Sequence, residues 1–180
     1  MKTKKTKKII LAMNIIAAII FIALCAKTGA ILYSFCVSLF GNSEGAGNLY
    51  LGLNLSDLYN FDITYYTFMG AFIIIISGLK AYLFFSVIKL FSRTNIEQPF
   101  SETIASLIKK MSFVAFTIGL FAAIAVKYSE WIADKGVELN TLFEYISGGE
   151  EFVFFGGILF MIWVVFKKGI EMQTENELTI

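Results

Sequence analysis

The chain has 180 residues, of which 57% are hydrophobic and 16% are charged, and its formal net charge is +1. Because about a quarter of the residues in a soluble domain are charged, this composition excludes an ordinary soluble domain and indicates a membrane protein. Histidine is absent and only two cysteines are present, which excludes histidine-based acid–base catalysis, cysteine–histidine catalysis and the usual zinc sites within this chain. We therefore expect a protein that is not an enzyme and that holds no cofactor or metal.

Four apolar runs are long enough to cross a membrane, since a bilayer core about 30 Å thick requires roughly 20 apolar residues per helix. They predict transmembrane helices over about 9–29, 65–90, 107–126 and 146–166. The intervals between them are too short for a separate soluble domain, so we expect one all-α domain over 1–180, an integral membrane four-helix bundle. Runs such as "AFIIIISG" also lack the alternation of β-barrel strands.

The first run follows the basic leader "MKTKKTKK", a pattern shared with secretory signal peptides. Residues 9–26 are longer than the usual apolar core of a signal peptide. In a lipoprotein signal, a small residue would precede Cys25, but Leu24 stands there. We therefore favour an uncleaved first helix.

The positive-inside rule assigns the side with more Lys and Arg near helix ends to the cytoplasm. With four crossings, both termini share a side, and most of the Lys and Arg residues fall on it, whereas most of the acidic residues fall on the other. We expect a multi-pass protein of a bacterial cytoplasmic membrane with both termini in the cytoplasm.

Residues 91–106 form the predicted cytoplasmic connector between the second and third crossings. Pro99 is the only proline and prevents the second helix from continuing through it. Ser101 stands where a helix N-cap belongs, and Glu102 follows in the first turn of the next helix. The connector is either a solvated linker or a docking surface for a cytoplasmic partner. The cytoplasmic tail, 167–180, either folds back on the basic connector, presents a motif to a partner, or is a solvated end.

Lys80, in "SGLKAYLFF", is the clearest charge inside an apolar run. A charge at the centre of a membrane helix costs about 2.5–3.5 kcal/mol on insertion scales. Lys80 lies about 15 Å from the cytoplasmic end of its helix, at the far limit of snorkelling. We expect its side chain to face the bundle interior or a wet cavity, either as a ligand contact or switch or in a structural role.

Three further candidate functional residues are expected at the non-cytoplasmic helix ends: Lys127 after the third helix, and Glu150 and Glu151 before the fourth. The fourth apolar run is short, so this helix must either thin the bilayer or carry the two glutamates into the outer edge of the bilayer core. Two alternatives remain open, an ion pair with Lys127 or exposure of both glutamates to interfacial water.

Two local patterns, "QPFS" in the connector and "FKKGIEMQTENELTI" at the C-terminus, resemble a bacterial four-pass membrane family of unknown function, the domain-of-unknown-function family numbered 2975. The residues that resemble its connector motif are Pro99, Phe100 and Ser101. The residues that resemble its tail motif are Gly169, Glu175, Asn176, Glu177, Leu178, Thr179 and Ile180. Gln98 stands where Asn is common in the family, and Glu177 where Asp is common. Family members are often encoded beside a small helix-turn-helix regulator of the Cro/CI type, which implies a membrane component that controls or sequesters a transcription factor.

The expected function is regulatory or sensory, with the lipid bilayer and a cytoplasmic helix-turn-helix regulator as partners. Direct nucleic-acid binding is not expected, because the basic residues lie where topology already requires them. A homo-oligomer is compatible with the sequence. The alternative is a small transporter or immunity-type protein that acts on an amphipathic peptide or lipid, which would require a water-accessible cavity reaching Lys80.

Overall fold

The computed structural model of the protein describes residues 2–41, 43–94 and 100–177. All regular secondary structure in these ranges is helical. The elements are α1 (Lys2–Phe40), the 3-10 helix η1 (Ser43–Gly47), α2 (Ser56–Phe61), α3 (Ile63–Arg93), α4 (Glu102–Ala133), α5 (Phe143–Ile146) and α6 (Gly149–Glu177). The expected all-α membrane four-helix bundle is confirmed, and Pro99 lies outside the described residues.

Helices α1, α3, α4 and α6 are each long and apolar enough to cross a membrane, so the chain is a multi-pass membrane protein. Helices α1, α3 and α4 extend beyond the expected ranges at both ends, whereas α6 begins slightly later than expected, at Gly149, and continues further, to Glu177. The largest difference is in α1, which continues to Phe40 because the residues after Gly29 are apolar and contain no proline. Its 39 residues correspond to about 58 Å of helix, so α1 must tilt or project beyond the bilayer core.

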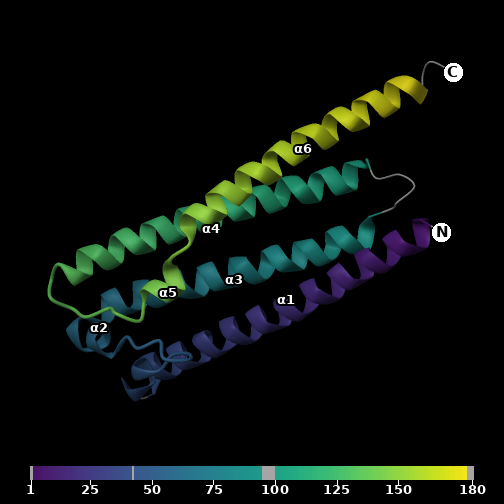
Figure 1. Cartoon of the computed structure of the whole chain (residues 1–180). Coiled ribbons are helices and arrows are strands. Elements are labelled where there is room, and N and C mark those ends of the chain that lie inside the picture. The colour runs from purple at the N-terminus through teal and green to yellow at the C-terminus, as the bar shows by residue number, and fades with distance from the viewer. Residues whose placement is uncertain (1, 42, 95–99, 178–180) are drawn as a thin grey trace.

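The four long helices pack as a series, with α1 on α3, α3 on α4 and α4 on α6 (Figure 1). Neighbours in the series run antiparallel, and the described parts of α1 and α6 do not pack along each other. We call the end where α3 ends at Arg93 and α4 begins at Glu102 the connector end, and the opposite end the cap end. Lys2 and Glu177 both lie toward the connector end, so the two ends of the described chain lie at the same end of the bundle.

The contact between α1 and α3 has a regular register. Three pairs repeat along it: Asn14 with Ser92, Phe21 with Phe85, and Thr28 with Gly78. Successive pairs are seven residues apart on each helix, which is the spacing of two helical turns in left-handed antiparallel packing. Lys27 and Lys80 are next to the third pair, so this register places both lysines at the same level of the bundle.

The cap end is covered by residues 43–62 and 134–148, which together we call the cap. Its first part is fixed by buried leucines and by backbone hydrogen bonds such as Leu55 N to Ala46 O, 2.8 Å. The hydroxyl of Tyr145 donates to the carbonyl oxygen of Tyr50, 2.8 Å away, and thereby joins the second part to the first. The two loops therefore form one unit above the helices.

Candidate functional site

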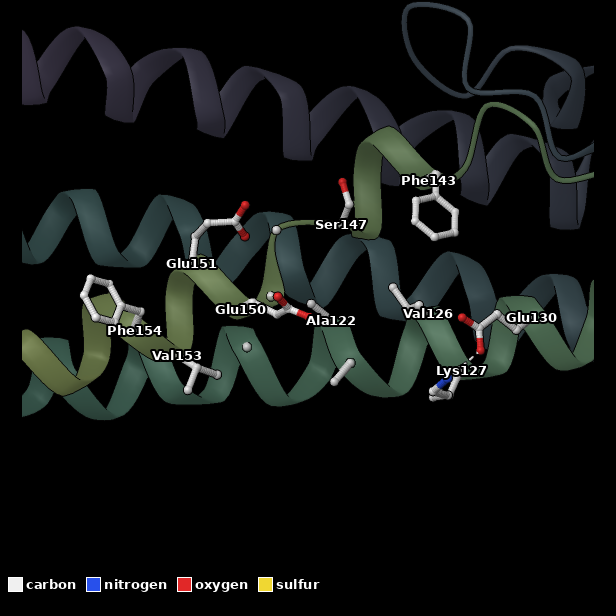
Figure 2. A pocket seen from close by; sticks show the side chains of 14 residues that line it. Ala122, Val126, Lys127, Glu130, Phe143, Ser147, Glu150, Glu151, Val153 and Phe154 are labelled. Carbon is white, nitrogen blue, oxygen red and sulfur yellow. Dashed lines mark hydrogen bonds and ion pairs between the residues drawn. The ribbon is translucent and has the colours of Figure 1, made fainter.

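Lys127 lies near the cap end of α4 and is 79% exposed. Its ammonium forms an ion pair with Glu130, one turn later on the same helix, at 2.7 Å (Figure 2). Neither Glu150 nor Glu151 pairs with Lys127, so the inter-helix ion pair that the sequence left open is not formed. The partner three residues away is preferred because α4 already holds it on the same face.

Glu150 and Glu151 lie in the first turn of α6, and both are exposed. With Lys127 and Glu130 they line a groove of about 740 Å³ between α4, α6 and the cap. Figure 2 shows Glu150 near Ala122, whereas the Glu151 side chain points away from the Lys127–Glu130 pair. The two adjacent glutamates therefore face different surroundings.

Small residues place the start of α6 directly on α4. A Cβ at Gly119 would come within 2.4 Å of Val153 Cγ2 and within 2.8 Å of the carbonyl oxygen of Gly149. Further along the seam, the buried hydroxyl of Ser112 donates to the carbonyl oxygen of Gly156 at 2.8 Å. Small residues of this kind allow close helix contact in membranes, and this contact fixes the first turns of α6 against α4.

Lys80 is half-buried on α3, and its ammonium lies over the ring of Phe152, 5.1 Å from the centroid. A second lysine, Lys27 on α1, lies in the same way over the ring of Tyr145 at 4.6 Å. Lys27 and Glu151 are both close enough to act electrostatically on Lys80. The structure therefore brings together charged groups from α1, α3 and α6, and we call Lys27, Lys80 and Glu151 the charged cluster.

Lys27 was missed in the sequence because the first helix was expected to end near Gly29, which would have placed this lysine at a helix end. The signal that could have identified it is the continuous apolar sequence after Gly29. With that segment helical, Lys27 is an internal charge like Lys80.

At the connector end, the two expected motifs meet. The rings of Phe100 and Phe166 pack with centroids 5.2 Å apart, and a Cβ at Gly169 would come within 2.7 Å of the Phe100 ring. The Lys167 ammonium lies 3.1 Å from a carboxylate oxygen of Glu102. We call these five residues the connector–tail junction.

The expected cap at Ser101 is present, since its hydroxyl accepts from the backbone N–H of Ile104 at 3.4 Å. The tail is helical as far as Glu177, and Lys168 pairs with Glu171 at 3.1 Å within it. Of the tail motif, Glu175, Asn176 and Glu177 therefore lie in the last part of α6. Leu178, Thr179 and Ile180 lie outside the described residues.

No family model, curated protein or solved structure matches this chain. The resemblance to family 2975, which depends on the connector and tail motifs, therefore stays a prediction.

Proposed function

We propose that this chain is a non-enzymatic regulatory or sensory protein of a bacterial cytoplasmic membrane, with both termini in the cytoplasm. In this proposal it acts on a cytoplasmic helix-turn-helix regulator through the connector–tail junction and the tail. The proposed orientation, with the connector end in the cytoplasm, is supported by the basic residues near that end, since Lys and Arg favour the cytoplasmic side. They are the basic leader and Lys89, Arg93, Lys109 and Lys110.

The observation that carries the proposal is the continuity of α6. One helix carries Glu150 and Glu151 in its first turn and packs closely on α4 at Gly119. The same helix contacts Phe100 through Gly169 and continues to Glu177. A shift of a packed helix at one end is transmitted along its length, and such shifts are a common form of switching. A change at the charged cluster or the groove can therefore alter the surface offered to a partner at the connector end.

A bacterial two-hybrid assay tests this proposal, with the full chain and the helix-turn-helix regulator encoded nearest to its gene. We expect association with the full chain and its loss on deletion of residues 173–180. The matched control is Glu138→Gln in the cap, which leaves the connector end unchanged. Association that is unchanged by the deletion would show that the tail does not dock the regulator.

The groove between α4, α6 and the cap favours a second candidate function. It is lined by charged side chains and by the aromatic rings of Phe143 and Phe154, a combination suited to an amphipathic peptide or lipid. Lys80, which such a cavity was expected to reach, is not among the residues that line this groove. A transporter or immunity-type protein that uses the groove would lose resistance or export on Phe154→Ala while association with the regulator stayed intact.

A further inference from the structure

The charged cluster contains one more positive than negative charge. Lys27 and Lys80 contribute two ammonium groups, and Glu151 contributes one carboxylate near Lys80. In the described part of the chain, neither lysine forms an ion pair within 4.0 Å or donates a hydrogen bond. Their identified partners are the rings of Tyr145 and Phe152, which attract a cation but accept none of its three N–H donors as an oxygen would.

Both lysines are held in place by residues from the other half of the chain. The α1–α3 register puts them at one level, and Tyr145 of α5 and Phe152 of α6 lie against them. Tyr145 is itself fixed by its hydrogen bond to the Tyr50 carbonyl oxygen. The two ammonium groups are therefore positioned by four helices before any ligand binds, which lowers the ordering cost of binding.

The level of the cluster in the bilayer matches that of a lipid head group. The ammonium of Lys27 lies against Tyr145 of the cap. That of Lys80 lies against Phe152, next to Glu151 in the first turn of α6. Both side chains therefore reach from apolar helix toward the end of the bundle where this first turn is expected at the edge of the bilayer core. The side between α1 and α6 is not closed by packing of their described parts on each other, so a lipid can approach from the membrane.

We propose that Lys27 and Lys80 bind a phosphate group that carries one net negative charge, as in the phosphodiester of an anionic phospholipid. One such charge neutralises the excess charge of the cluster, and the phosphate oxygens supply the acceptors that the two ammonium groups lack. This inference names the class of ligand that would act on the membrane protein itself, and to that extent it rests on the proposed regulatory or sensory function. Binding itself is measured without any partner.

The test uses the purified full chain in nanodiscs that contain phosphatidylglycerol, phosphatidylethanolamine or an equal mixture of the two. The protein is then released into mild detergent, and native mass spectrometry measures which lipid it retains. We expect preferential retention of phosphatidylglycerol. We expect retention to fall about tenfold or more in Lys27→Met/Lys80→Met, and to persist in Lys27→Arg/Lys80→Arg. Lys168→Met is the matched control, because it removes an exposed lysine that is already paired with Glu171 at the other end of α6.

A parallel arm adds inorganic phosphate to the detergent-solubilised protein, and displacement of the lipid by millimolar phosphate would identify a free phosphate as the source of the same chemistry. Equal retention of both lipids by the wild type would overturn the site. Undiminished retention by the folded double Met variant would overturn it as well, and so would an equal loss in Lys168→Met. Thermal unfolding of each variant identifies misfolded samples. If the double Met variant is misfolded, the double Arg variant decides whether the site exists, because it keeps both positive charges and should still retain phosphatidylglycerol. Regulator association is measured on the same variants, so loss of lipid retention with association intact separates the two proposals.

Discussion

The close contact between α4 and α6 makes Gly119 the most sensitive position along this helix pair. In Gly119→Ala, the new methyl group would lie 2.4 Å from Val153 Cγ2 and 2.8 Å from the Gly149 carbonyl oxygen. The first neighbour is the end of a side chain that can rotate, but the second is backbone. The helices must therefore separate, and overpacking of this kind costs about 1–3 kcal/mol.

Gly157→Ala is the matched control, because it lies in α6 and a Cβ there would meet no atom within 4 Å. Both substitutions gain the same helix propensity, roughly 1 kcal/mol in favour of alanine. The difference in the free energy of unfolding between the two variants therefore isolates the steric term, and we expect Gly119→Ala to be less stable than Gly157→Ala by about 1–3 kcal/mol.

The assay is reversible unfolding in mixed micelles by titration with sodium dodecyl sulfate, monitored by tryptophan fluorescence. Adding Val153→Ala to Gly119→Ala should restore part of the stability, since it removes the side-chain clash and leaves the clash with the Gly149 carbonyl oxygen. If Gly119→Ala and Gly157→Ala were equally stable, the two helices would not be in the close contact on which the argument depends.

Three further predictions concern single interactions. Glu102→Gln should destabilise the protein by less than about 1 kcal/mol, because its ion pair with Lys167 is largely exposed, and a double-mutant cycle at low and high salt should show this coupling disappear as salt rises. Tyr66→Phe should cost about 1 kcal/mol in the same unfolding assay, because it removes a hydroxyl that is hydrogen-bonded to Ser38 in the buried core. The N–H group of Thr64, which donates to the Asp62 carboxylate at the start of α3, lowers the pKa of that carboxyl. The stabilisation from Asp62 is therefore fully present above the pKa of the unfolded state, about 3.9, and is lost as pH falls through the lower folded pKa. An acid titration of stability should accordingly be shallower in Asp62→Asn than in the wild type, and identical curves would contradict this assignment.

The sequence predicted the helical class, the four crossings and the cap at Ser101, because these depend on local properties. Apolar runs of sufficient length have few alternatives in a bilayer, and a serine before an acidic first turn is a local signal. The ends of α1 were not predicted. A basic leader and an internal glycine were interpreted as boundaries, whereas the helix continues through both, and the apolar sequence after Gly29 was the signal that was overlooked.

The candidate site was predicted only in part, because its members come from distant parts of the chain. Lys80 stands out in the sequence as an internal charge, but its neighbours Lys27 and Phe152 are brought to it by the register of α1 and by the start of α6. The choice of Lys127 between Glu130 and Glu150 likewise depended on side-chain geometry. Proximity between residues of different helices cannot be obtained from hydrophobicity alone.

The serial packing of the long helices has a consequence for how the protein is made. Because α1 pairs with α3 and α4 pairs with α6, the first hairpin is complete in sequence before synthesis of the second begins. Each hairpin can enter the bilayer as a unit while the ribosome is still translating, and the α3–α4 contact then joins two preassembled halves. Biogenesis of this chain therefore requires no early helix to wait for the C-terminal one.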